Sequence, residues 1–231
     1  MAVRALVFDV FGTLVDWRTS IARAFADAGV AGDPHELADD WRARYVPILE
    51  EVNRGARPWG DFDELHRATL DALLAERGSA PAAADRDRLV HAWHRLEPWP
   101  DVVEGLRALR RDRLTATLSN GHLGLLVDLA RHGELPFDCV LSAELARAYK
   151  PASEVYLMAA HLLRVAPQEL MLVACHPWDL AGARAAGLGT ALVDRPLEYG
   201  PGSPEREDPL ADVRVADLHE LAARLPGTTS S

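Results

Sequence analysis

The sequence alternates short apolar runs with segments of helical periodicity, and this alternation constrains the fold more than any other feature. The first run, V-R-A-L-V-F-D, ends at Asp9 and is followed by Gly12. Later runs of the same kind, the last of them weaker, are Leu114–Leu118, Phe137–Leu141, Leu170–Ala174, Gly189–Val193 and Val213–Val215. Short apolar runs bounded by turn residues indicate buried strands.

Helical patterns separate these predicted strands. One covers Asp101 to Arg110, where Asp101 stands three residues before Glu104 in a capping-box arrangement, and another covers Gly121 to His132 and stops at Gly133. Strands that alternate with helices form a parallel sheet with right-handed crossovers. We therefore expect an α/β fold with a Rossmann-like core, built from residues 1–16 and 99–225.

Residues 17–98 break the alternation, because they contain helical patterns and no convincing strand. Apolar residues recur there every three or four positions, as in Leu37, Trp41, Tyr45, Leu49 and Val52. Ligands of open α/β sheets bind outside the carboxyl ends of the strands. An insertion after the first strand is therefore expected to form a helical cap over that edge.

Charge and composition exclude several classes of function. The 231 residues carry 25 Lys and Arg against 35 Asp and Glu, a formal net charge of −10, and this argues against nucleic-acid binding. The sequence has no secretory signal and no apolar run of 18 residues, so no membrane association is expected. Two cysteines in apolar stretches suit a reducing cytoplasm. The terminal residues 226–231 are expected to be a disordered tail.

Four short strings carry candidate chemistry. Asp9 lies in F-D-V-F-G-T-L-V-D, where Thr13 can hold its carboxylate, and Ser119 and Asn120 end the next strand in T-L-S-N-G. Lys150 precedes a proline in A-Y-K-P, and Asp179 follows another strand in A-C-H-P-W-D. Any one of these residues can be an ordinary turn or cap residue. Their joint position at strand ends predicts one site.

The order and spacing of these strings resemble the haloacid dehalogenase superfamily, most of whose members are magnesium-dependent phosphatases. The resemblance implies a strand-end aspartate nucleophile, here Asp9. A phosphatase of this type needs a second aspartate two positions later, where this chain has Phe11, and a metal-binding carboxylate where it has Cys175. A hard cation such as Mg²⁺ prefers oxygen ligands. Phosphoryl transfer thus lacks both its proton shuttle and a principal metal ligand.

The remaining pattern is similar to the L-2-haloacid dehalogenases of type II. That resemblance implies hydrolytic dehalogenation of short 2-haloalkanoic acids to 2-hydroxy acids through an aspartyl ester. It implies a small haloacid substrate, a halide product, no metal and no other cofactor, and it suggests a homodimer. Covalent catalysis by a carboxylate divides a difficult displacement into two easier steps.

The same resemblance assigns roles to the polar residues. Arg42, in D-W-R-A-R-Y, is expected to receive the halide, although Arg44 lies only two residues away. Asn120 would assist at the halide. Ser119 and the backbone N–H groups near Val10 and Phe11 would bind the substrate carboxylate.

A second group of roles concerns Asp9 itself and the water that hydrolyses the ester. Lys150 would keep Asp9 ionised, Tyr156 would form a hydrogen bond within the cluster, and Asp179 would position or deprotonate the water. Val46, Phe62 and Trp178, together with Phe11, would form an apolar wall around the reacting carbon. His176 stands where the family often has an asparagine, so it is either a group that orients water or a simple loop residue.

Two alternative functions stay open on the sequence. A magnesium phosphatase could rebuild its metal site from other carboxylates such as Asp16 or Asp194, and a chain without catalytic activity could serve as a small-acid binding or interaction module. His91 and His94 lie three residues apart on a predicted helix, but no neighbouring ligand stands at metal spacing. Surface histidines are the preferred interpretation there.

Overall fold

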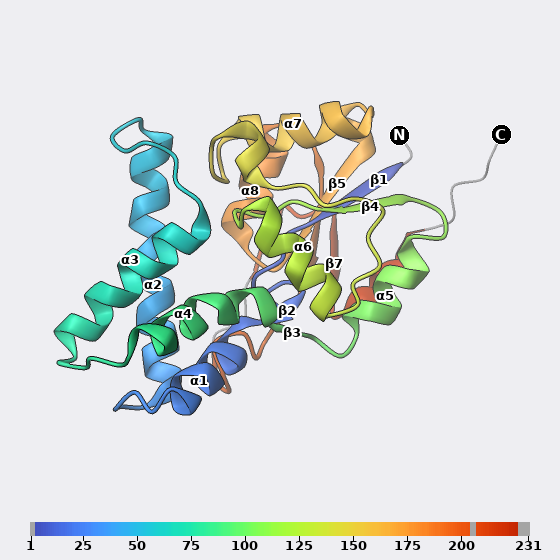
Figure 1. Ribbon diagram of the computed structural model, residues 1–231. Helices are drawn as coiled ribbons and strands as arrows, with labels where there is room; N and C mark the ends of the chain where they lie inside the picture. The colour runs from blue at the N-terminus through green and yellow to red at the C-terminus, as the bar shows by residue number, and fades with distance from the viewer. Residues whose placement is uncertain (1–2, 204–206, 226–231) are drawn as a thin grey trace.

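A five-stranded parallel sheet forms the centre of the protein in a computed structural model that describes residues 3–203 and 207–225 (Figure 1). Its strand order is β4-β1-β5-β6-β7. The strands are β1 (Ala5–Phe8), β4 (Leu114–Thr117), β5 (Leu170–Ala174), β6 (Gly189–Val193) and β7 (Val213–Val215). The flanking helices are α5 (Val102–Leu109), α6 (Leu123–His132), α7 (Ser153–Leu163), α8 (Pro177–Ala185) and α9 (Leu218–Arg224). The α/β class expected from the alternation is confirmed.

The central position of β1 decides where the site forms. Phe8, the last residue of β1, is paired with Thr117 of β4 on one side and with Val173 of β5 on the other. The segments that follow these three strands therefore leave the sheet side by side at its carboxyl edge. The strand order changes direction at β1, which is the point where open α/β sheets bind ligands.

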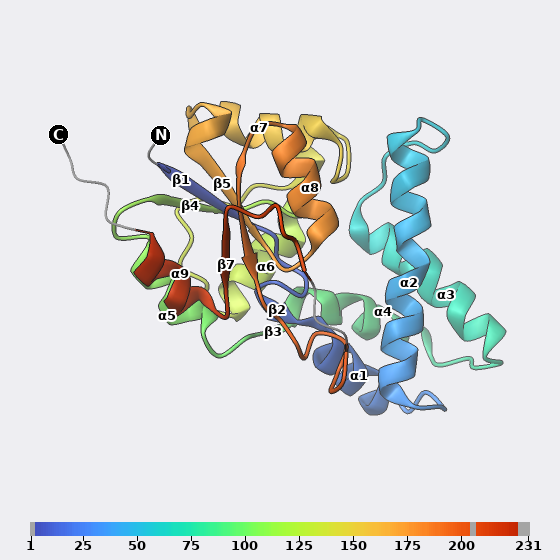
Figure 2. The same cartoon turned by 180° about the vertical axis from the view of Figure 1, so that it is seen from behind.

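Four helices and a 3-10 turn occupy the insertion after β1, beside the sheet in two opposite views (Figures 1 and 2). They are α1 (Trp17–Asp27), α2 (Pro34–Asn53), α3 (Phe62–Glu76), α4 (Ala83–Ala92) and η1 (Trp93–Arg95). Asp33 and Asp61 cap α2 and α3 by accepting backbone N–H bonds. The two ends of the insertion pair as short antiparallel strands, β2 (Val15–Asp16) and β3 (Glu97–Pro98).

Aromatic side chains fill the interior of the insertion and connect it with the sheet edge. Trp17, Trp41 and Trp93 are fully buried. Phe11, which follows β1, stacks on Phe62 of α3 at 6.0 Å between ring centroids and meets the Trp93 ring edge-on. Large aromatic surfaces dominate the energy of such contacts. The helices are thus held directly over the end of β1.

Two local expectations from the sequence are wrong. The run 137–141 forms only isolated bridges, between Ala116 and Cys139 and, just beyond it, between Ser119 and Ser142. Backbone bonds from Asp138 and Cys139 to the Thr115 carbonyl remain, and the Asp138 carboxylate accepts further hydrogen bonds from the backbone and side chain of Thr115. Short helical turns, η2 (Ala143–Ala146) and η3 (Pro167–Glu169), occur in the following connections.

The predicted capping box of α5 is the second error. Asp101 has helical dihedrals and makes no side-chain cap. Its carboxylate instead binds the Arg195 guanidinium through both oxygens and accepts the backbone N–H of Leu218. The two bonds to the guanidinium form a bidentate ion pair, which is stronger than the single hydrogen bond of a cap, so the tertiary contact prevails.

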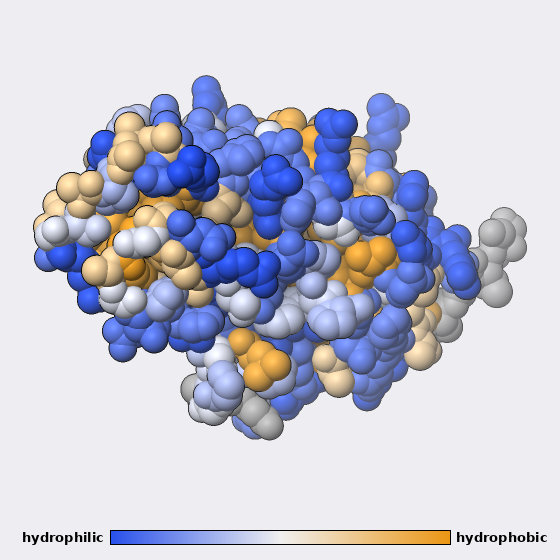
Figure 3. All heavy atoms as spheres, turned by 60° about the horizontal axis from the view of Figure 1, so that its bottom comes forward, coloured by the Kyte–Doolittle hydropathy of each residue, from blue (hydrophilic) through white to orange (hydrophobic). Residues whose placement is uncertain are grey.

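The described surface is mainly hydrophilic on the face shown in Figure 3, where apolar residues gather in smaller groups. Among the described residues, no helix is both long and apolar enough to span a membrane. The tail expected to be disordered, residues 226–231, lies outside the described residues.

Candidate active site

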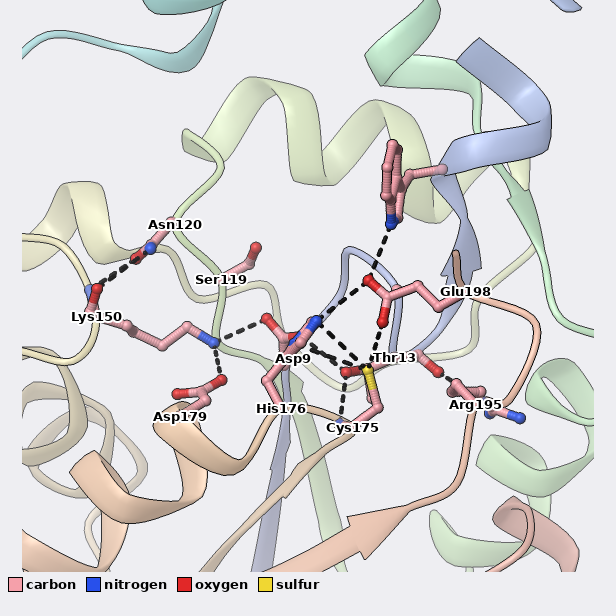
Figure 4. A network of polar contacts seen from close by, with 12 residues as sticks. Asp9, Thr13, Ser119, Asn120, Lys150, Cys175, His176, Asp179, Arg195 and Glu198 are labelled. Carbon is pink, nitrogen blue, oxygen red and sulfur yellow. Dashed lines mark hydrogen bonds and ion pairs between the residues drawn. The ribbon is translucent and has the colours of Figure 1, made fainter. Parts of the chain in front are cut away.

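Asp9 lies at the centre of a buried polar network at the end of β1 (Figure 4). Its Oδ2 accepts a hydrogen bond from the Thr13 hydroxyl at 2.8 Å and lies 3.2 Å from His176 Nδ1. Its Oδ1 accepts from Lys150 Nζ at 2.8 Å. The structure therefore brings three side chains to Asp9, and the most distant of them, His176, lies 167 residues away in sequence.

The surrounding charges keep Asp9 ionised. Burial alone would raise the pKa of this carboxyl, but the Lys150 charge and the His176 hydrogen bond outweigh burial and hold the pKa far below its ordinary value. Burial would likewise lower the pKa of Lys150, yet the carboxylates of Asp179 and Asp9 raise it. Asp9 is a permanent anion and Lys150 a permanent cation at neutral pH.

Asn120 fixes the backbone around Lys150. Its side-chain carbonyl accepts the Lys150 N–H at 2.7 Å, and its amide lies 3.4 Å from the Lys150 carbonyl oxygen. Ser119 is fully buried beside it and lines the same cavity. Both predicted residues thus reach the site, and Asn120 also aligns the loop that carries the lysine.

A cavity of about 390 Å³ opens beside Asp9. Polar side chains from the strand ends and aromatic side chains from the insertion are both among its lining residues, which include Asp9, Phe11, Arg42, Tyr45, Val46, Phe62, Ser119, Asn120, Lys150, His176 and Trp178. Most of the exposed lining is apolar, as small-molecule sites commonly are. Val10 is buried and is not part of this lining.

Arg42 supplies a cation to the cavity from α2. Its side chain is 12% exposed, its guanidinium lies 4.5 Å from the Trp17 ring centroid, and it donates a 2.6 Å hydrogen bond to the Tyr45 hydroxyl. Arg44 points elsewhere and pairs with Glu76 at the surface. The structure thereby resolves which of the two arginines reaches the site.

The four predicted wall residues all line the cavity, but they differ in burial. Phe11 and Phe62 are buried, whereas Val46 and Trp178 are 49% and 47% exposed. The two buried rings form the floor near Asp9. The two exposed side chains lie at the solvent side, where the Trp178 indole stacks on His176 at 5.7 Å.

Asp179 lies next to Lys150, on the side away from the cavity. One of its oxygens accepts from Lys150, the other accepts the Tyr156 hydroxyl at 2.6 Å, and its side chain is fully buried. It is absent from the cavity lining, and burial raises its pKa. That Asp179 positions or deprotonates the hydrolytic water stays a prediction. Asp179 holds Lys150 from behind, and the predicted Tyr156 hydrogen bond is the one that anchors it.

His176 and Glu198 occupy the side of Asp9 opposite Lys150. His176 Nε2 lies 3.2 Å from Glu198 Oε1, and the glutamate also accepts the Trp17 indole N–H at 2.9 Å. Sequence reasoning missed Glu198, which lies in a loop rich in proline and glycine. Its only sequence signal is a carboxylate in a loop near the predicted sheet edge, and many surface residues share that signal. Its side chain is 1% exposed.

Two groups of described residues have the spacing of metal ligands. Cys175, His176 and Glu198 form one at the site, and Asp63, His94 and His122 form the other between α3 and α6. Sulfur and imidazole donors suit soft ions rather than Mg²⁺.

The carboxylates that could have rebuilt a magnesium site are engaged outside the Asp9 network. Asp16 caps α1 by accepting the Thr19 N–H, and Asp194 pairs with Arg214. The contacts given for Asp16 and Asp194 thus lie away from Asp9 and do not add an oxygen ligand beside it.

Comparison with known proteins supports a single family. A model of haloacid dehalogenase-like hydrolases matches residues 3–187. The (S)-2-haloacid dehalogenase 1 of Pseudomonas sp. strain CBS-3 is 34% identical, over 96% of this chain and 98% of that protein. A crystal structure of an L-2-haloacid dehalogenase is 46% identical with a TM-score of 0.92, covering 97% of this chain and 99% of the other. A defluorinating L-2-haloacid dehalogenase is 42% identical with a TM-score of 0.93, covering 96% and 95%.

Proposed function

The chain belongs to the haloacid dehalogenase-like hydrolases, and from that membership and the site we propose that it hydrolyses the carbon–halogen bond of short 2-haloalkanoic acids to give 2-hydroxy acids. The observation that carries the proposal is the environment of Asp9. Its carboxylate is ionised, buried and in contact with an apolar cavity that also contains the Arg42 cation. A carboxylate screened from water in this way is a competent nucleophile toward carbon.

In the first step, an oxygen of Asp9 attacks C2 of the substrate and the halide departs with the bonding electrons. Arg42 receives the halide, because its guanidinium remains charged and lies in the same cavity. Ser119 and the backbone N–H groups near Val10 and Phe11 bind the substrate carboxylate, and Asn120 assists at the halide. Lys150 reduces the repulsion between this second anion and Asp9.

In the second step, water attacks the carboxyl carbon of the Asp9 ester. His176 orients this water, because its Nδ1 lies 3.2 Å from Asp9 Oδ2 and its ring lines the cavity. Thr13 and Tyr156 hold the carboxylates of Asp9 and Asp179, and Asp179 positions or deprotonates the water from the side of Lys150. No metal or organic cofactor takes part in either step.

The organisation of the chain forms part of the same proposal. Residues 1–16 and 99–225 make up the catalytic core, and residues 17–98 make up the cap that supplies Arg42. We further propose a homodimer in the cytoplasm, and size-exclusion chromatography with light scattering tests the oligomeric state.

One assay separates this function from its alternatives. The protein is incubated with (S)-2-chloropropionate, chloroacetate, fluoroacetate and p-nitrophenyl phosphate, with and without EDTA, and halide and phosphate are measured. Halide release that is insensitive to EDTA supports the proposal. Phosphate release that EDTA abolishes supports a magnesium phosphatase instead, and the absence of any turnover supports a binding module.

Asp9→Asn tests the nucleophile directly. We expect it to lower halide release at least about 10⁴-fold, as loss of a covalent nucleophile does. In the wild-type protein, a single turnover in ¹⁸O-labelled water must place the label in Asp9. Unchanged turnover of the variant would exclude covalent attack by this residue.

A further inference from the structure

A second cluster of polar side chains lies between the insertion and the core, away from Asp9. His94 of η1 is only 5% exposed, so the interpretation of this residue as a surface histidine is wrong. Its Nε2 lies 3.0 Å and 3.2 Å from the two carboxylate oxygens of Asp63, in the first turn of α3. His122, the residue before α6, completes the cluster, because the segment after α4 packs against α6 (Figures 1 and 2).

Asp128 of α6 orients the His94 ring. Its Oδ2 lies 2.8 Å from His94 Nδ1, while Nε2 of the same ring points at Asp63. Histidines that bind a metal are commonly held in this way, because the nitrogen that does not bind the metal donates to a carboxylate. The fold therefore already presents His94 Nε2 to an ion bound at Asp63.

His122 offers nitrogen atoms that the described structure does not use in hydrogen bonds. Its Nε2 lies 3.9 Å from Asp63 Oδ2, which is too far for a hydrogen bond. Its Nδ1 is buried and has no hydrogen-bond partner among residues 3–203 and 207–225. Buried polar atoms without a partner are uncommon in folded proteins. An ion held beside Asp63 would give this imidazole a partner.

The spacing of the three side chains suits a tetrahedral ion. One ligand atom from each lies within 4.8 Å of the other two. Zinc binds imidazole nitrogen and carboxylate oxygen at about 2.0–2.2 Å, so its neighbouring ligands are about 3.3 Å apart. The distances of 3.0 Å and 3.9 Å from Asp63 to the two imidazoles lie on either side of this value. The Asp63 side chain is 40% exposed, which gives water access as a fourth ligand.

We propose that a divalent ion of the zinc type binds between Asp63, His94 and His122. Imidazole donors favour zinc and the neighbouring transition metals over Mg²⁺. The ion takes the place of the proton between His94 Nε2 and Asp63, and Asp128 keeps the ring aligned from behind.

The position of this site in the fold indicates a structural link. Asp63 and His94 belong to the insertion, whereas His122 precedes α6 of the core. None of the three lines the cavity beside Asp9. The bound ion therefore fixes α3 against α6 and takes no part in the displacement at carbon, so this inference goes beyond the proposed function.

Zinc binding by the full chain, without a histidine tag, tests the site. After treatment with EDTA and removal of the chelator, equilibrium dialysis against zinc chloride and metal analysis should find one equivalent per chain. His94→Gln and His122→Gln should each lose this equivalent. Asp128→Asn should weaken zinc binding by about 10–100-fold, as loss of a partner that orients a metal ligand does.

His91→Gln is the matched control. His91 is exposed and its ring lies 4.6 Å from the His94 ring, but it is not one of the three grouped ligands. We expect this variant to bind zinc with the wild-type affinity. Loss of the zinc in His91→Gln, or its retention in both His94→Gln and His122→Gln, would overturn the inference.

Cobalt distinguishes this site from the group of Cys175, His176 and Glu198. Cobalt bound by nitrogen and oxygen gives visible bands, whereas a bound thiolate adds an intense near-ultraviolet band. We expect the cobalt spectrum to lack the thiolate band and to be the same in Cys175→Ala. A thiolate band, or cobalt lost in Cys175→Ala but retained in His94→Gln, would place the ion at the other group and refute the proposal.

Stability provides a readout that does not depend on activity. An ion that binds only the folded chain raises its resistance to unfolding. Zinc should therefore raise the urea midpoint of the wild type and leave that of His122→Gln unchanged, with far-ultraviolet circular dichroism in EDTA showing that the variant folds. EDTA should reverse the shift without lowering halide release. An equal shift in His122→Gln would contradict binding at this site.

Discussion

Gly12→Ala should be far more damaging than one methyl group suggests. The residue adopts φ +86°, and its missing side chain leaves the space that the Glu198 carboxylate occupies. Left-handed backbone costs a residue other than glycine about 1–2 kcal/mol. An alanine Cβ would also lie 2.2 Å from Glu198 Oε1, so the glutamate must move away from Trp17 or His176.

The magnitude follows from adding these two effects. Loss of one hydrogen bond to a charged group costs about 1.5–3 kcal/mol. Together with the backbone strain, the substitution should reduce the free energy of unfolding by about 2.5–5 kcal/mol. The displaced Glu198 also loses its contact with His176, so steady-state halide release should fall.

Gly78→Ala is the matched control. Gly78 also has a left-handed backbone, at φ +62°, but nothing lies within 4 Å of a Cβ placed there. We expect it to cost only the strain of about 1–2 kcal/mol and to leave activity unchanged. Urea denaturation measures the free energy of unfolding of both variants. If Gly12→Ala is no more destabilising than Gly78→Ala, then a glycine is not required at position 12 to make room for the Glu198 carboxylate.

Three further predictions concern charged groups. Lys150→Met should abolish halide release and destabilise the fold by about 3–5 kcal/mol, since it removes the cation that two buried carboxylates share; intact stability in a denaturation experiment would contradict this. Arg42→Gln should lower kcat/KM for halide release by about 10²–10³, whereas Arg44→Gln should leave it unchanged. His94 lies between carboxylates of α3 and α6, and although burial lowers its pKa their charges raise it overall. Its stabilisation should be complete below about pH 6.5 and lost as pH rises through the folded-state pKa, so the urea-midpoint difference from His94→Gln should shrink with increasing pH.

Local sequence patterns were sufficient to predict those strands and helices that depend mainly on the residues of their own segment. The runs Leu170–Ala174 and Gly189–Val193 form β5 and β6 with the predicted bounds, because each is a buried apolar strand whose ends are set by adjacent residues. The helical nature of the insertion was likewise evident from its periodicity. Asp101 was misread because its partner, Arg195, lies 94 positions away and competes with the local cap.

For the site, the sequence by itself determined which residues are candidates for the chemistry: Asp9, Ser119 and Lys150 stand in strings with a recognisable order, and Phe11 and Cys175 stand where a magnesium phosphatase needs carboxylates. Only the tertiary structure decided which groups touch one another. It placed Asp179 behind Lys150, turned Arg42 rather than Arg44 into the cavity, and brought Glu198 to His176. The physical reason is that a strand or helix is encoded by neighbouring residues, whereas the partner of a buried charge is chosen by the packing of segments that are remote in sequence.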